Sequence, residues 1–190
     1  MGCCKSKVPV PNVYANFVDP QTQKRYIVMD FIPDTDMQRL LPSLTPTEKN
    51  TASERIKEVI NELRAIPPPD YLGNLNGTFY IDGVLSTPDK NRVISGPLRD
   101  QEEMDHSVLE RLSQAQLPHF IRLLKAKVKY TPKNHRAHFT HEDLLPKNII
   151  VGRIARCEKE ADFKVSLIDW NMSGWYPKFW EFAIRRCVVN

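Results

Sequence analysis

The sequence lacks the features that mark membrane-spanning, secreted and metal-binding proteins. No apolar run approaches the roughly 20 residues that a membrane-spanning helix needs, and no apolar segment follows the start as in a signal peptide. Its four cysteines, Cys3, Cys4, Cys157 and Cys187, show neither metal-ligand spacing nor a disulfide framework. We therefore expect a cytoplasmic protein, in a compartment where thiols stay reduced.

The chain also lacks a strong charge of either sign. It has 27 basic and 23 acidic residues, and the formal net charge of +4 is spread along its length. Nucleic-acid-binding domains usually gather basic residues into a patch, so no nucleic acid is expected as a partner. With 190 residues, 41% hydrophobic and 26% charged, the composition is that of one globular domain or slightly more. No feature of the sequence points to a protein partner.

The first residues contain a short pattern for lipid attachment. Gly2 follows Met1, Ser6 fills the hydroxyl position of the N-myristoylation pattern, and Cys3 and Cys4 are placed to accept palmitate. One myristoyl chain binds a membrane only marginally, so a second chain or basic residues are needed. The segment predicts membrane association through an acylated N-terminus. The alternative is that so short a pattern occurs by chance.

Apolar, β-branched and aromatic residues predict a β-hairpin after this segment. Residues 12–18 and 25–32 form two such runs, and the Asp-Pro-Gln-Thr-Gln-Lys between them supplies turn residues. The second run is almost wholly apolar, so we expect a buried strand there. A short helix over residues 36–41 should follow.

Helical periodicity dominates the middle of the chain. A capping box from Thr45 to Glu48, with proline at the first helical position, predicts a helix with one buried face. Two more helices are expected from Asp100 and over residues 118–127. Residues 71–97 contain glycines, prolines and scattered aromatics, and we expect a long irregular loop. Together with the strands, these elements indicate an α+β fold.

A second hairpin is expected in the last third of the chain. Residues 148–151 and 163–168 are apolar runs separated by a charged connector. In an antiparallel hairpin the first residue of one strand lies beside the last residue of the other. The pattern therefore brings Asn148 and Asp169 together at one end of the hairpin.

Oxygen ligands at that end of the hairpin suggest phosphoryl transfer. Asp143 stands on a short loop before the first strand, within reach of Asn148 and Asp169. Mg²⁺ takes oxygen ligands and is often bound by one or two carboxylates together with substrate phosphates. In the kinase template a catalytic Asp takes the hydroxyl proton, an Asn five residues later holds metal, and a further Asp holds metal. Any one of these residues alone would more simply be structural, but the ordered set favours a phosphotransferase.

Several motifs resemble one known family. Phe139–Ile149, FTHEDLLPKNI, resembles the HGDLxPxNIL signature of aminoglycoside phosphotransferase and choline-kinase-like proteins. Leu167–Glu181 is similar to the IDWExAGWYPxYWE segment of fungal members, and Gly96–Glu102 to their GPFxxE segment. Residues 8–11 and 26–33 look like their IPVPxV and YIVMEYIPG segments. The resemblance covers nearly the whole chain and does not specify a substrate.

This resemblance implies a protein-kinase-like fold that transfers the γ-phosphate of ATP, with Mg²⁺, to a small-molecule hydroxyl. It implies that Asp143 is the catalytic base, that His141 braces the catalytic loop, and that Asn148 and Asp169 bind Mg²⁺. The adenine ring would lie against a hinge made of Asp30, Phe31 and Ile32.

The same resemblance implies a domain organisation. Residues 1–7 would be a tail, 8–33 a remnant two-stranded N-lobe with the hinge, and 34–190 a mostly helical C-lobe, truncated at its C-terminus. In the family a phosphate-covering loop, a strand lysine and a helix glutamate precede the segment that matches residues 8–11, and we expect all three to be missing. Glu142 stands where the family has glycine, and Asn171 where it has glutamate.

Three interpretations of function remain open from the sequence. The first is an ATP-dependent phosphotransferase whose activity is reduced or absent, because losing one preorganised donor commonly costs about 10²- to 10³-fold in rate. The second is a pseudoenzyme or lipid-anchored interaction module. The third is a fragment of a longer, active kinase.

Overall fold

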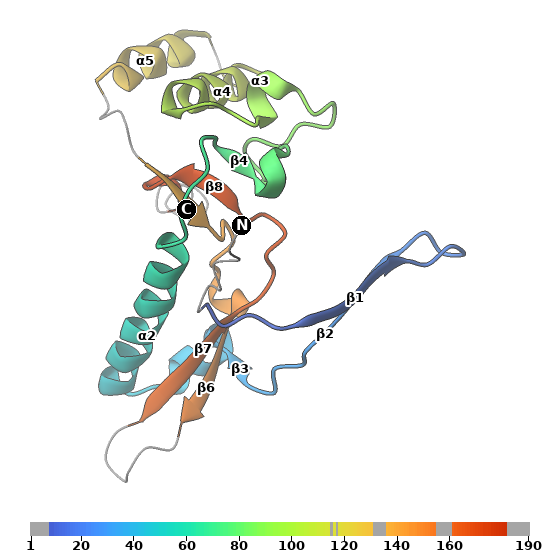
Figure 1. Cartoon of the computed structure of the whole chain (residues 1–190). Helices are drawn as coiled ribbons and strands as arrows, with labels where there is room; N and C mark the ends of the chain where they lie inside the picture. Colours follow the sequence, from blue (N-terminus) through green and yellow to red (C-terminus); the bar gives the residue numbers. More distant parts are fainter. Residues whose placement is uncertain (1–7, 115, 117, 131–135, 155–160, 182–190) are drawn as a thin grey trace. The chain divides into compact units, whose positions relative to one another are not determined.

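The computed structural model describes residues 8–114, 116, 118–130, 136–154 and 161–181. The chain divides into two compact units, and each is formed by two separate stretches of sequence. The first unit consists of Met1–Leu63 and Leu144–Asp169, and the second of Arg64–Asp143 and Trp170–Asn190. Figure 1 shows the elements in sequence colours.

The first unit contains the predicted N-terminal hairpin as a two-stranded sheet of its own. Strands β1 (Val13–Val18) and β2 (Arg25–Met29) pair antiparallel, with Phe17 opposite Tyr26. The rings of Phe17 and Tyr26 stack at 5.6 Å between centroids. The expectation of a buried second strand is wrong, because every residue of β2 is exposed. Among the described residues, this sheet consists of these two strands only.

Three further strands of the first unit form a second antiparallel sheet. Their order is β3 (Thr35–Asp36), β6 (Ile149–Ile154) and β7 (Asp162–Leu167). The β6–β7 pair is the predicted second hairpin, with Ile149 opposite Leu167 at one end. Val151, Phe163 and Val165 are buried in this sheet. It therefore supplies much of the core of the unit.

Helix α2 (Pro46–Arg64) begins as the sequence predicts. The Glu48 carboxylate accepts hydrogen bonds from the Thr45 N–H at 2.8 Å and hydroxyl at 2.9 Å, and the Glu48 N–H donates back to that hydroxyl at 3.3 Å. Ala52 and Leu63 are buried on the predicted face. The short helix α1 (Met37–Leu40), capped by Asp36, confirms the helix expected before it, and a 3-10 turn, Leu41–Ser43, connects it to α2.

The second unit combines helices with a three-stranded sheet. The helices are α3 (Arg92–Ser95), α4 (Gln101–Ser113) and α5 (Pro118–Val128). The strands pair antiparallel in the order β4 (Gly73–Asn74), β8 (Gly174–Pro177) and β5 (Ala137–Thr140). Helices α4 and α5 confirm the two predicted from Asp100 and over residues 118–127. The sheet was not predicted from the sequence.

Residues 71–97 have little regular structure, as expected, yet they contribute much of the hydrophobic core of this unit. Besides β4 and α3 they contain a 3-10 turn, Leu75–Gly77. The buried cluster is made of Leu72, Tyr80, Leu85, Ile94, Leu98, Met104, Tyr176 and Trp180. The segment is therefore held by burial of its apolar side chains. Tyr176 of β8 and Trp180, which follows this strand, both belong to this core.

No helix in the described ranges is long and apolar enough to cross a membrane.

Candidate active site

The end of the β6–β7 hairpin brings the neighbours of Asn148 and Asp169 together. Ile149 pairs with Leu167, and the Ile168 N–H donates to the Asn148 carbonyl oxygen at 3.1 Å. Asn148 closes the 3-10 turn Pro146–Asn148 that leads into β6, and its N–H donates to the Leu145 carbonyl at 2.8 Å. Asn148 and Asp169 therefore lie at the same end of one hairpin within the first unit, as the antiparallel arrangement predicts.

The two residues differ in surroundings. Asn148 is buried, with 4% of its surface exposed, whereas Asp169 is exposed. Asp169 also has a positive φ of 66°, in the left-handed region that side chains other than glycine rarely adopt. Such strained residues cost about 1–3 kcal/mol and tend to cluster at functional sites. The hairpin therefore holds an exposed carboxylate in a specific, strained backbone conformation.

His141 and Asp143 lie in the second unit, on the loop that follows β5. His141 is fully buried, and its ring lies 4.5 Å from that of Trp170. The Asp143 N–H donates to His141 Nδ1 at 3.3 Å. Because Nδ1 accepts this bond, the neutral ring carries its proton on Nε2. His141 thus accepts a hydrogen bond from the backbone of Asp143, and its bracing role stays a prediction.

The hinge residues Asp30, Phe31 and Ile32 follow strand β2. The Asp30 carboxylate accepts hydrogen bonds from the Tyr14 hydroxyl and from the Asn12 side chain, the latter at 2.7 Å. The bond from Tyr14, together with those from Asn12, holds the pKa of Asp30 below its usual value. Phe31 is 88% exposed. The Asp30 side chain is therefore bound to residues of the N-terminal hairpin and the segment before it, and the hinge role of residues 30–32 stays a prediction.

A buried polar cluster in the second unit was not found from the sequence. The Asp82 carboxylate accepts a hydrogen bond from the Tyr176 hydroxyl at 2.9 Å and others from the Val84 and Leu85 N–H groups. Burial raises the pKa of Asp82, although these hydrogen bonds act in the opposite direction. Burial also raises the pKa of Tyr176 far above its usual value, and the nearby Asp82 charge adds to this. Asp82 lies in the segment read as an irregular loop, and no motif marks it.

Within the described ranges, no three His, Cys, Asp or Glu side chains gather into a group that could hold a metal ion by itself. Asn148 and Asp169 offer an amide and a carboxylate oxygen, which suit a hard cation such as Mg²⁺. Such a pair fits an ion whose remaining ligands are phosphate oxygens and water. The lipidation candidates Gly2, Cys3 and Cys4 lie outside the described residues, and their acylation stays a prediction.

Comparison with known proteins identifies the family. The model of the phosphotransferase enzyme family matches residues 4–184, which is almost the entire chain. The chain belongs to the phosphotransferase enzyme family. This confirms the resemblance seen in the motifs and places the chain in the protein-kinase-like superfamily.

A solved structure shows the same fold. A thermostable mutant of aminoglycoside phosphotransferase APH(4)-Ia, in its apo form, aligns with a TM-score of 0.52 and 17% sequence identity. The alignment covers 93% of this chain and 55% of that protein, so the chain spans about half the length of the phosphotransferase it matches. At this identity the likeness establishes the fold, which confirms the predicted α+β, kinase-like class. No curated protein sequence matches the chain.

Glu142 has a backbone conformation that is more typical of the glycine found at this position in the family signature. The family signature has glycine at this position, and Glu142 has a φ of 70°, a left-handed conformation that glycine adopts without strain. Glu142 thus adopts a backbone conformation that glycine would adopt without strain. The roles of His141, Asp143, Asn148 and Asp169, and of the hinge residues, stay predictions.

Proposed function

We propose that this protein is an ATP-dependent phosphotransferase that transfers the γ-phosphate to a hydroxyl group of a small molecule. The observation that carries the proposal is the hydrogen bond from the Ile168 N–H to the Asn148 carbonyl oxygen, at 3.1 Å. This bond holds the end of the β6–β7 hairpin closed, so that Asn148 and Asp169 stay together. Asn148 matches the family signature that also contains Asp143, and Asp169 matches the separate IDWExAGWYPxYWE segment.

Asn148 and Asp169 are the residues that would hold Mg²⁺. Mg²⁺ held by these two side chains would supply positive charge against the negative charge that develops on the phosphate during transfer. The buried position of Asn148 limits the motion of its side chain, and the exposed Asp169 presents its carboxylate to an incoming nucleotide. The strain at Asp169 is consistent with a carboxylate that is held for binding.

Asp143 would act as the base. In the transfer the acceptor hydroxyl oxygen bonds to the γ-phosphorus, the bond between that phosphorus and the β–γ bridging oxygen breaks, and ADP leaves. The hydroxyl proton passes to the Asp143 carboxylate. His141 holds the Asp143 backbone through Nδ1, so its role is positioning. The adenine would contact the backbone of the hinge at Asp30, Phe31 and Ile32.

Nucleotide binding tests the proposal. Isothermal titration of ATP with Mg²⁺ should show saturable binding that depends on the metal, because Asn148 and Asp169 make few contacts to the nucleotide without it. Asp169→Asn and Asn148→Ala should each weaken metal-dependent binding by about tenfold or more, since each removes one metal ligand. Asp89→Asn, which changes an exposed carboxylate of the second unit, is the matched control and should bind as the parent does.

Catalysis is tested separately by measuring ADP release with a panel of small alcohols, sugars and amino alcohols. Asp143→Asn should keep nucleotide binding and lose acceptor-dependent ADP release. Binding without turnover in the parent protein would support the interpretation as a pseudoenzyme. The absence of nucleotide binding at millimolar ATP would contradict the proposal as a whole.

A further inference from the structure

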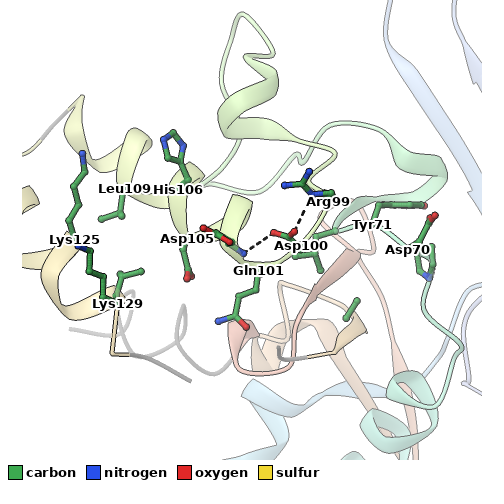
Figure 2. A pocket seen from close by; sticks show the side chains of 15 residues that line it. Asp70, Tyr71, Arg99, Asp100, Gln101, Asp105, His106, Leu109, Lys125 and Lys129 are labelled. Atoms are coloured by element: carbon green, nitrogen blue, oxygen red, sulfur yellow. Dashed lines mark hydrogen bonds and ion pairs between the residues drawn. The ribbon is translucent and has the colours of Figure 1, made fainter. Parts of the chain in front are cut away.

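A cavity of about 920 Å³ lies within the second unit, and none of the residues assigned to phosphoryl transfer lines it. It is bordered by helices α4 and α5, by the segment that precedes β4, and by Ala137 at the start of β5. Its volume lies within the range of about 300–1,000 Å³ that is typical of small-molecule sites. Figure 2 shows the side chains that line it.

Strand β5 separates this cavity from the catalytic loop. Ala137, which lines the cavity, is the first residue of β5, whereas His141 and Asp143 follow its last residue. A strand rises about 3.3 Å per residue, so the length of β5 alone is about 10 Å. Neither His141 nor Asp143 is among the residues that line the cavity. A ligand here would not occupy the place of the acceptor hydroxyl beside Asp143.

The floor of the cavity is apolar. Leu72 is buried, with 4% of its surface exposed, and Leu109, Val128 and Ala137 are half-buried. Tyr71 adds a half-buried aromatic side chain at one side. Apolar surface in a concave site favours a ligand with a hydrocarbon or aromatic part, because that part leaves water when it binds.

Charges of opposite sign stand on opposite sides of this floor. Lys125 and Lys129, four residues apart at the end of α5, lie together at one side in Figure 2, and Asp70 lies at the other. Glu102, in the first turn of α4, adds a second exposed carboxylate. Within the described ranges, neither lysine forms an ion pair with the carboxylates that line the cavity.

Two other charged residues that line the cavity, Arg99 and Asp100, already form ion pairs or hydrogen bonds within the protein. Arg99 pairs with Asp100 at 3.1 Å and with Glu103 at 3.2 Å. Asp100 also caps α4 by accepting the N–H groups of Glu102 and Glu103. This leaves the lysine pair as the cationic side of the cavity, and Asp70, at the other side in Figure 2, as the acidic side.

We propose that this cavity binds a small dipolar molecule. Its anionic group, a carboxylate or phosphate, pairs with Lys125 and Lys129, and its cationic group, an amine or guanidine, faces the acidic side. A short apolar middle part covers Leu72 and Leu109. The site includes none of the residues assigned to phosphoryl transfer and does not depend on that activity.

A graded series of straight-chain ω-amino acids tests the charge arrangement. Binding is followed by chemical-shift changes of the protein amides on titration. Diamines and dicarboxylates of the same lengths are the ligand controls, because each places a like charge against one side of the cavity. We expect one length of ω-amino acid to bind about tenfold more tightly than either control of that length. Equal binding of all three classes, or no saturable binding up to about 10 mM, would overturn the proposal.

Charge reversal on α5 identifies the anionic end of the ligand. Lys125→Glu combined with Lys129→Glu should shift the preference from the ω-amino acid to the diamine. The matched control combines Arg122→Glu with Lys127→Glu, which changes the same charge on exposed residues of α5 that do not line the cavity. This control should leave the preference unchanged.

The charge-reversed protein could fail to fold, so a milder variant, Lys125→Gln combined with Lys129→Gln, tests the same point. It should lose the preference for the ω-amino acid over the diamine without gaining the reverse preference. Retention of the parent preference in the Gln variant would assign the binding to another surface and contradict the proposal. A change in that variant and none in the α5 control would support it.

Discussion

Arg55 on α2 holds the buried carboxylate of Asp162 at the first position of β7. Arg55 Nε donates to Asp162 Oδ1 at 2.7 Å, and a terminal guanidinium nitrogen donates to Oδ2 at 3.2 Å. Asp162 is buried, with 6% of its surface exposed, while Arg55 also pairs with the exposed Glu58. The two-pronged contact fixes the helix against the sheet of the first unit.

Arg55→Ala should therefore destabilise the first unit by about 2–3 kcal/mol, because it leaves the Asp162 carboxylate buried without its cation. Urea unfolding followed by circular dichroism measures the change. Glu58→Ala removes only the exposed partner of Arg55 and should cost less than about 0.5 kcal/mol. Equal effects of the two variants would show that the contact with Asp162 contributes no more than a surface ion pair.

Gly174 is expected to be intolerant of any side chain. A Cβ atom at Gly174 would lie 2.7 Å from the Gly73 carbonyl oxygen and 3.2 Å from the Asn74 Cα, both on the neighbouring strand β4. Gly174→Ala should cost about 1–3 kcal/mol, because backbone atoms must move apart. Gly83→Ala is the matched control, since nothing lies within 4 Å of a Cβ there. Thermal unfolding of the two variants side by side tests this.

The backbone conformation of Glu142 predicts an unusual order of stabilities. Because its φ is 70°, any residue with a Cβ is strained there, and glycine is not. Glu142→Gly should be more stable than Glu142→Ala by about 1–2 kcal/mol, the reverse of the order in an ordinary loop. Both variants lack the glutamate side chain, so the difference between their free energies of unfolding does not include the effect of losing it. If Glu142→Ala were the more stable variant, the left-handed conformation would be refuted.

Stability should fall in alkaline solution because of Tyr80 and Tyr176. Burial raises the pKa of both phenols well above its usual value, and the Asp82 charge adds to the effect. Above about pH 10 the unfolded chain loses these protons while the folded protein keeps them. The folded state then binds more protons, so the free energy of unfolding falls with rising pH, by up to about 1.4 kcal/mol per pH unit for each phenol.

Urea unfolding between about pH 9 and about pH 11 measures this slope. Tyr80→Phe and Tyr176→Phe should each reduce it. Tyr130→Phe is the control, because the Tyr130 side chain is 89% exposed. A slope that is unchanged in both buried-tyrosine variants would contradict the argument.

Local patterns in the sequence were sufficient where the stabilising contacts are themselves local. The capping box at Thr45 and the hairpin end at Asn148 each involve residues that are close in sequence or are aligned by one strand pairing. The Asp82–Tyr176 hydrogen bond, by contrast, joins residues 94 positions apart. The strands around it are two to four residues long, too short for an alternating pattern to show. This is why the second unit's sheet was missed.

The wrong expectation for β2 has a different cause. Its mainly apolar residues 26–29 predict burial by composition, but burial depends on what covers the strand. Likewise Glu142 was recognised in the sequence as a replaced glycine, while the strain that it carries follows only from its φ. Contacts and backbone angles of this kind cannot be read from the pattern alone.

The exposed hairpin β1–β2 gives the chain an uneven distribution of local stability. An isolated two-stranded hairpin is only marginally stable in water, and these strands leave Val13, Tyr14, Ile27 and Met29 at least half exposed. Its amide hydrogens should therefore exchange with solvent through local opening, at a small fraction of the free energy needed to unfold β6 and β7. Because the hinge directly follows β2, the segment proposed to receive adenine is joined to the part of the first unit that opens most easily.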